Sequence, residues 1–134
     1  MARAMQAKHL DSPDETRTFD RGILQTVTLG NFKVARAVLQ PGWRWSEHVK
    51  PIAQTNSCQV EHAGIVLSGR LRVVMDDGSE TEIGPGDVYV IPPGHDAWVT
   101  SAQEFVGVDV SSETVEKFAK EAGAIDKAKD RLSD

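Results

Sequence analysis

The 134-residue sequence contains a single cysteine, Cys58. One cysteine cannot form an intramolecular disulfide, so the fold depends on its core, and a reducing compartment is expected. No run approaches the roughly 20 apolar residues of a membrane helix. Residues 1–10 mix charge with alanine and lack the apolar centre of a secretory signal. These absences predict a soluble, cytoplasmic protein that does not enter a membrane.

Basic residues are scarce in the central part of the chain. Residues 51–110 hold two of them, Arg70 and Arg72, against nine acidic residues, and the formal net charge of the whole chain is −5. A surface with this balance repels phosphate groups. Nucleic acid and an anionic membrane surface are therefore not expected partners.

The pattern that is present is a β pattern. Between residues 22 and 110, short runs of Val, Ile, Leu and Thr alternate with Gly, Pro and Asp, and we expect no helix between the strands. Asp76–Ser79 is the strongest hairpin signal. Val88–Ile91 is apolar apart from one hydroxyl, which predicts burial on both faces. The expected strands cover residues 23–29, 32–39, 59–67, 71–75, 81–83, 88–91, 98–100 and 106–110.

About eight strands without intervening helices predict an all-β sandwich or barrel formed by residues 22–110. Residues 1–21 are polar and are expected to form an arm or an edge strand. Residues 111–134 are expected to form a short C-terminal helix, beginning near Ser112, and a tail. The apolar face of that helix would consist of Val115, Phe118, Ala119 and Ala122.

Two segments resemble the paired motifs of the cupin superfamily. Gly86–Gly94 matches the opening Gly-x5-Pro-x-Gly of the second motif at every fixed position. Gly42 and His48 match the opening of the first motif, and His62 and Gly69 match its close. The resemblance spans residues 39–110. It implies a double-stranded β-helix, or jelly-roll barrel, and a homodimer formed through exchanged edge strands.

The sequence departs from the metal-binding pattern of that family, which has three histidines and one glutamate. Lys50 stands at the second histidine position, and His62 stands at the glutamate position. Ala97 stands at the third histidine position, with His95 two residues earlier, and Ser101 replaces the distal asparagine. A metal site in this chain must therefore be assembled differently.

Side chains two residues apart on a strand share a face, so His95 can aim where a residue at position 97 would. On this basis the predicted metal ligands are His48, His62 and His95, with Cys58 as a possible additional ligand. Imidazole donors with an open position suit Zn, Ni, Cu or Fe better than Mn or Mg. The alternative is that the histidines are hydrogen-bonded structural residues and that Cys58 is a small buried thiol.

Five further residues are expected in the pocket or around the metal ligands. Lys50 could attract an anionic ligand. Trp43 and Trp45 would share one strand face, either as core and interface packing or as an aromatic lid, and Tyr89 and Trp98 would form core or pocket wall.

The sequence leaves two main functions open, and a third alternative beside them. The first is a metal-dependent oxygenase, isomerase or lyase that acts on a small molecule. The second is a non-catalytic module that binds or senses a small ligand; a purely structural, oligomer-forming domain is a third alternative. The chain has neither a Gly-x-Ser-x-Gly elbow nor a phosphate-binding glycine loop. Serine-dependent hydrolysis and nucleotide-driven chemistry are therefore unsupported.

Overall fold

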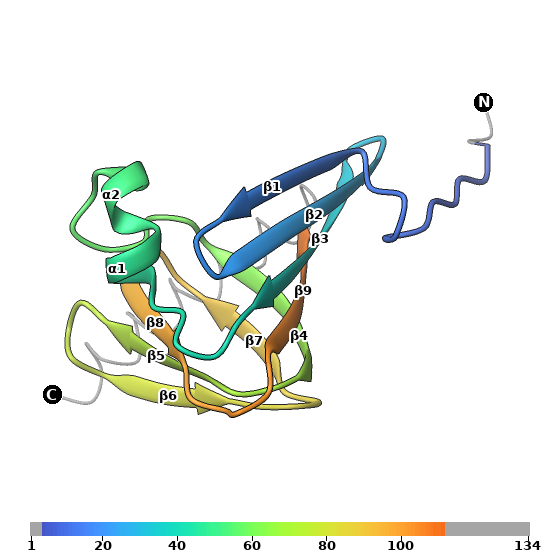
Figure 1. Ribbon diagram of the computed structural model, residues 1–134. Helices are drawn as coiled ribbons and strands as arrows, with labels where there is room; N and C mark the ends of the chain where they lie inside the picture. The colour runs from blue at the N-terminus through green and yellow to red at the C-terminus, as the bar shows by residue number, and fades with distance from the viewer. Residues whose placement is uncertain (1–3, 112–134) are drawn as a thin grey trace, which may run out of the picture.

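The computed structural model describes residues 4–111. Nine strands and two one-turn helices make up this part of the chain (Figure 1). In chain order they are β1 (Glu15–Phe19), β2 (Gly22–Leu29), β3 (Phe32–Leu39), α1 (Trp45–His48), α2 (Lys50–Ala53), β4 (His62–Ser68), β5 (Leu71–Met75), β6 (Glu80–Ile83), β7 (Val88–Ile91), β8 (His95–Val99) and β9 (Phe105–Ser111).

The strands form two antiparallel sheets, and this confirms the predicted all-β jelly-roll class. The larger sheet has the order β1-β2-β3-β9-β4-β7, and the smaller one has the order β6-β5-β8. Neighbours far apart in the sequence, such as β3 and β9, pair along their whole length. The predicted hairpin turn at Asp76–Ser79 is present between β5 and β6, and a second turn at Gly30-Asn31 joins β2 to β3.

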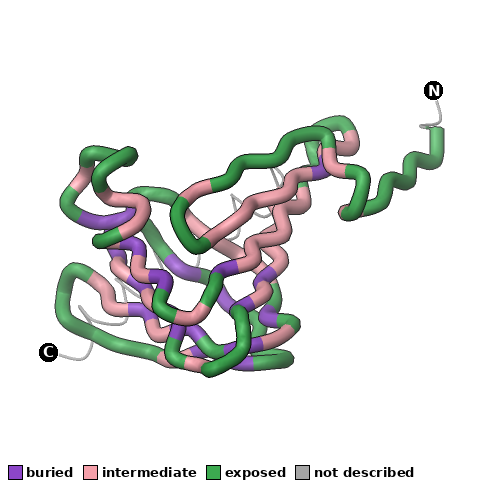
Figure 2. The backbone as a smooth tube through the Cα atoms, in the orientation of Figure 1, coloured by how far each residue is buried: buried purple, intermediate pink, exposed green. Residues whose placement is uncertain are grey.

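Buried side chains from both sheets meet in one core. Val66 of β4 and Phe105 of β9 are 1% and 3% exposed. They belong to the same cluster as Leu71 of β5 and Val99 of β8. Figure 2 shows the buried positions concentrated between the sheets, whereas β1 is largely exposed. The core therefore holds the two sheets together, and β1 is an outer edge strand paired only with β2.

The prediction that Val88–Ile91 is buried on both faces is wrong. Val88 is 79% exposed and Tyr89 is 8% exposed, so β7 alternates outward and inward. The reason is that only one face of the larger sheet packs on the core, so alternate residues of β7 point away from it. Its outward valines continue an apolar outer surface that includes Ile65 and Leu67 of β4.

The segment between β3 and β4 also differs from expectation, because it contains α1 and α2 where no helix was expected. Trp45 begins α1 instead of sharing a strand face with Trp43. Both indoles are nevertheless buried in the core. The guanidinium of Arg44, which lies between them in sequence, stacks 4.3 Å from the ring centroid of Trp98.

Within residues 4–111, no helix is long and apolar enough to cross a membrane. The expected C-terminal helix with its face at Val115, Phe118, Ala119 and Ala122 lies outside the described residues.

Gly64 lets β4 approach β9 closely. A Cβ built at this position would lie 2.0 Å from the backbone carbonyl oxygen of Val108. A real Cβ cannot occupy that position, so any side chain here would force the two strands apart. The absence of a side chain therefore sets the register in which Gly64 faces both Asp109 and Tyr89.

Gly64→Ala is expected to lower the free energy of unfolding by about 3 kcal/mol, because the added methyl overpacks a backbone contact. Urea denaturation of the full chain measures this change. Gly30→Asn is the control, since Gly30 has a φ of +62° with nothing near its Cβ position. Asparagine tolerates such a conformation, and the control should cost no more than about 1 kcal/mol. Equal stability of the two variants would contradict the close-approach argument.

Candidate metal centre

Cys58 is held in place by backbone pairing with the start of β8. Its N–H donates to the carbonyl of His95 at 2.7 Å, and its own carbonyl accepts from the N–H of Gly94 at 2.7 Å. The preceding residue is also fixed, since the Ser57 hydroxyl donates to Asp76 at 2.9 Å. The thiol therefore sits beside His95 although 37 positions separate the two residues in the sequence.

His62, the first residue of β4, is oriented by a carboxylate on the neighbouring strand β9. Its Nδ1 lies 2.7 Å from Oδ2 of Asp109. Because a carboxylate accepts hydrogen bonds, Nδ1 carries the proton and donates it. The other nitrogen, Nε2, then faces the Cys58 thiol, with the sulfur 3.9 Å away.

The second oxygen of Asp109 is also engaged. Oδ1 accepts a short hydrogen bond from the hydroxyl of Tyr89 on β7. Burial, followed by the Asp109 charge, raises the pKa of Tyr89 far above its usual value. The phenol therefore remains a neutral donor, and three adjacent strands are joined through one carboxylate.

His95 is oriented in the same way by a backbone carbonyl. Its Nδ1 lies 2.8 Å from the carbonyl oxygen of Pro92, which can only accept. Nδ1 therefore carries a proton, and Nε2 is the nitrogen left for another partner. His95 and Ala97 share the buried face of β8, as the alternation of the strand requires.

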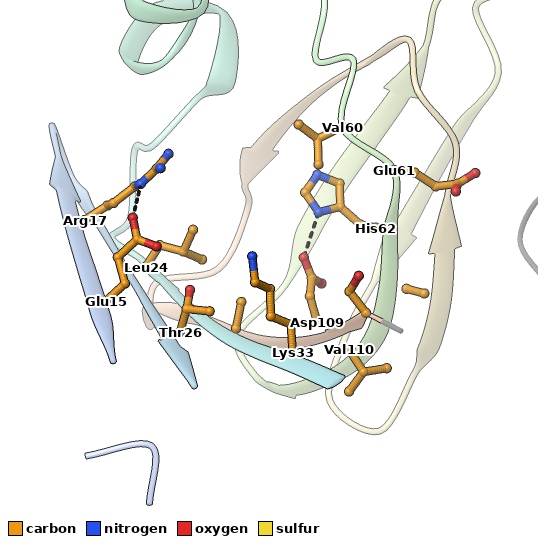
Figure 3. Close-up of a pocket in the computed structure, with 13 residues that line it drawn as sticks. Glu15, Arg17, Leu24, Thr26, Lys33, Val60, Glu61, His62, Asp109 and Val110 are labelled. Carbon is orange, nitrogen blue, oxygen red and sulfur yellow. Dashed lines mark hydrogen bonds and ion pairs between the residues drawn. The ribbon is translucent and has the colours of Figure 1, made fainter. Parts of the chain in front are cut away.

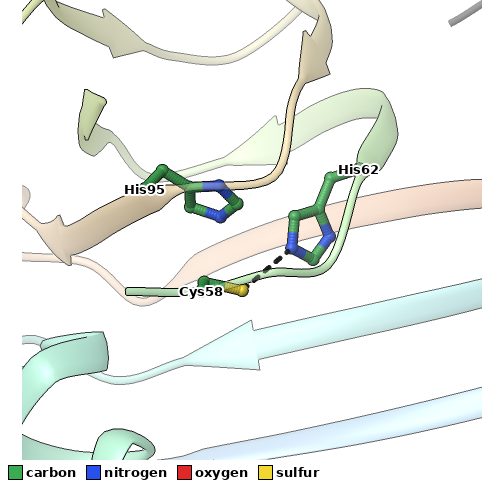
Figure 4. A group of neighbouring side chains, drawn as sticks. All are labelled: Cys58, His62 and His95. Atoms are coloured by element: carbon green, nitrogen blue, oxygen red, sulfur yellow. Dashed lines mark hydrogen bonds between the residues drawn. The ribbon is translucent and has the colours of Figure 1, made fainter. Parts of the chain in front are cut away.

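Cys58, His62 and His95 form one group of possible ligands (Figure 4). One donor atom from each residue lies within 4.8 Å of the other two. The two imidazole rings meet edge to face, with centroids 5.3 Å apart and planes at 67°. Cys58 and His95 are buried, being 7% and 3% exposed, so two of the three donors are shielded from bulk water.

The pKa values of Cys58 and His62 are shifted in opposite directions within this group. Burial alone raises the pKa of the Cys58 thiol, but hydrogen bonds from His62 and His95 outweigh it and lower the pKa to about 6. For His62, burial lowers the pKa, and the hydrogen bonds to Asp109 and Cys58 outweigh it and raise the pKa to about 9. Both shifts favour a thiolate beside an imidazolium at neutral pH.

The structure does not bring His48 into the group. His48 ends α1, and its Nδ1 accepts a hydrogen bond of 2.9 Å from the backbone N–H of Arg44. Its Nε2 faces Asp20 at 3.6 Å. The helical turn in this segment directs the ring toward its own backbone, and Cys58 occupies the third position of the cluster instead.

The other predicted pocket residues are dispersed. Lys50 begins α2, and Trp43, Trp45 and Lys50 are not among the residues that line the cavity described next. Trp98 is stacked against Arg44. Tyr89 alone contacts the group indirectly, through Asp109.

A cavity of about 550 Å3 lies on the concave face of the larger sheet, with His62 and Asp109 in its wall (Figure 3). Leu24 and Ala35 contribute apolar surface, whereas Lys33 contributes a charged group. A volume of this size is typical of small-molecule sites, which span roughly 300–1,000 Å3. The cavity therefore lies beside the candidate ligand His62.

Asp109 and Lys33 were not predicted from the sequence. Asp109 is the one charged residue of β9, which was a usable signal, but the alternation of Val106, Val108 and Val110 suggested that it faces outward. In the structure it lies in the row of the buried Phe105 and Gly107. Lys33 gave no such signal, because its position depends on the pairing of β3 with β9.

Comparison with known proteins identifies the type of domain. Residues 37–110 match the family model described as a cupin domain. The sequence matches no curated protein.

Solved structures share the fold at low sequence identity. The polyketide cyclase RemF from Streptomyces resistomycificus has a TM-score of 0.58 and 18% identity, over 81% of this chain and 80% of that one. A cupin 2 conserved barrel domain protein from Salinispora arenicola has a TM-score of 0.56 and 22% identity, over 89% and 99% of the two chains. KdgF from Halomonas sp. has a TM-score of 0.52 and 15% identity, over 72% and 83%. At these identities the likeness shows the fold alone.

Tyr89 is the single tyrosine of the chain, so its ionisation can be measured directly. Its raised pKa predicts no phenolate absorbance at 295 nm near pH 10, where an exposed tyrosine is half ionised. Unfolded chains ionise at that pH, so stability is lost as the pH rises above about 10, and the absorbance should rise only with unfolding. Tyr89→Phe provides the baseline. A midpoint near 10 in protein that circular dichroism shows to be folded would contradict the prediction.

Proposed function

The chain belongs to the cupin family, and on that premise we propose that it is a divalent-metal-binding cupin that acts on a small molecule. The metal ligands would be Cys58, His62 and His95. The reaction would fall within oxygenase, isomerase or lyase chemistry. Cytoplasmic location and homodimerisation stay predictions.

One observation supports this proposal above the others, namely the fixed orientation of both imidazoles. In each ring Nδ1 donates to an acceptor, the Asp109 carboxylate for His62 and the Pro92 carbonyl for His95. Protein metal sites use this arrangement because it fixes the ring and presents the other nitrogen to the ion. Here the two Nε2 atoms are directed to the same thiol.

The donor set fits a borderline or soft divalent ion. A tetrahedral zinc with ordinary bond lengths holds sulfur and nitrogen ligand atoms roughly 3.5 Å apart. The Cys58 sulfur and His62 Nε2 are 3.9 Å apart, so only a small contraction is required. One thiolate and two imidazoles suit Zn, Cu, Ni or Fe, whereas Mg and Mn prefer oxygen ligands.

A metal held by three protein donors would keep an open position and supply Lewis-acid polarisation of a substrate oxygen. The residues of the chain orient and shield that position. Asp109 holds the His62 ring, and Tyr89 holds Asp109 from its other oxygen. Because both oxygens of Asp109 are engaged, this carboxylate is a positioning group and not a free base.

The second candidate function is a non-catalytic module that binds or senses a small ligand. The engagement of Asp109 favours it, because the best-placed carboxylate of the cavity is not free to accept a substrate proton. The two functions differ in turnover. Product formed by metal-loaded protein in a metabolite screen supports the enzyme, whereas thermal stabilisation by a metabolite without product supports the binding module.

The ligand assignment predicts which variants lose metal. His62→Ala, His95→Ala and Cys58→Ser should each weaken zinc binding by a factor of about 100 or more, because loss of a ligand exceeds the effect of losing a supporting residue. Elemental mass spectrometry and competition titration with a chromogenic chelator, on protein purified without a metal column, measure the effect.

His48→Ala is the matched control for these variants. It removes a largely shielded imidazole that lies outside the group, so stoichiometric metal should remain. Retained metal in both His62→Ala and His95→Ala, or loss of metal in His48→Ala alone, would show that the assignment is wrong.

The supporting role of Asp109 predicts an intermediate effect. Asp109→Asn should weaken zinc binding about 10- to 100-fold, because an amide supports the ring less well than a carboxylate. Asp20→Asn makes the same change beside His48 and should leave the affinity unchanged. Equal affinities in the two variants would remove Asp109 from the metal site.

A further inference from the structure

We propose that the cavity beside the candidate metal centre binds a small monocarboxylic acid, with its carboxylate paired to Lys33 and its apolar body extending toward His62. This deepens the proposed function, and it rests on that function only for the end that faces the metal. The contact with Lys33 does not require a metal.

The pairing of three strands brings Lys33 and His62 to the same end of the cavity. Lys33 of β3 faces Ser111 of β9, and Gly64 of β4 faces Asp109. The same register, extended by two residues, places His62 opposite Ser111. Lys33 and His62 are therefore two inter-strand spacings apart, roughly 10 Å between backbones. Figure 3 shows the Lys33 side chain pointing into the cavity beside Asp109.

The next cross-strand row on the cavity face of the sheet contains Asp109, and its other two residues have little side-chain volume. Ala35 lies opposite Asp109 on one side and Gly64 on the other. Small residues at these positions leave room over the sheet between Lys33 and His62. Leu24 and Ala35 give this space apolar walls, which suit a hydrocarbon body.

Lys33 is the cation in the cavity that a ligand can use. Within residues 4–111, its ammonium forms no ion pair. The other cation in the wall, Arg17, is bound to the carboxylate of Glu15 at 2.9 Å. A carboxylate entering the cavity therefore meets one unpaired positive charge, two strand spacings across the sheet from His62.

The remaining charges of the cavity disfavour an anion with two negative charges. Glu15, Glu61 and Asp109 line the same space as Arg17 and Lys33. A phosphate monoester carries nearly two charges and would be repelled by these carboxylates, whereas a carboxylate carries one. The charge pattern therefore favours a monocarboxylate over a phosphate.

Calorimetric titration of hexanoate, hexanamide and hexyl phosphate at pH 7 tests the proposal. The full chain is used in metal-free and zinc-loaded form. Hexanoate should bind with a Kd of about 1 mM or tighter. Hexanamide, which has the same body without the charge, should bind about threefold more weakly, and hexyl phosphate should also bind more weakly than hexanoate.

The variants isolate the contribution of Lys33. Lys33 is exposed, so Lys33→Met should weaken hexanoate about threefold, a change of about 0.7 kcal/mol, and leave hexanamide unchanged. Lys33→Arg should retain most of the affinity, and circular dichroism verifies the fold of both variants. Lys50→Met is the matched control, because Lys50 is a cation outside the cavity wall.

Four results would overturn the proposal. They are hexanoate affinity unchanged in Lys33→Met, affinity lost in Lys50→Met, tighter binding of hexyl phosphate, and no saturable hexanoate binding in either form of the protein. Failure of the metal proposal gives a different result. Zinc would then not bind, while metal-free protein would still bind hexanoate in a Lys33-dependent way.

Discussion

The hydrogen bond between His62 and Asp109 is the constraint on which the site depends. It joins the first residue of β4 to β9 at 2.7 Å, across 47 positions of sequence. It exists because Gly64 allows the two strands to approach, and Tyr89 holds the same carboxylate from β7. Three strands are thus fixed relative to one another by polar contacts on the inner face, where apolar packing alone would not determine the orientation of a ring.

The fold could be predicted from the sequence because its information is local. Alternating apolar residues and the turns at Gly30 and Asp76–Ser79 determine strands and hairpins within a few residues. Burial of β7 was predicted incorrectly because the composition of Val88–Ile91 does not report whether the outer face of the assembled sheet is covered. The helical turns α1 and α2 were missed because the alternation of Trp43 and Trp45 fits an extended strand equally well.

The candidate site was predictable in part, for a related reason. His62, His95 and Cys58 were identified by motif position and strand parity, both of which are local. Their convergence depends on an isolated pairing between Cys58 and His95 that joins two distant segments. The position of Asp109 beside His62 depends on the register of β4 with β9, so the sequence pattern did not predict its role.

His62 has a position that none of the other ligand candidates shares. It belongs to the buried group with Cys58 and also to the wall of the cavity. A molecule in the cavity that alters the hydrogen bonds of Asp109 changes the basicity of the imidazole, and hence the affinity of the group for an ion. Thermodynamic linkage makes this coupling reciprocal, so the ion changes the affinity for that molecule by the same factor. One imidazole shared by two sites is thus sufficient for cooperativity inside a single small domain.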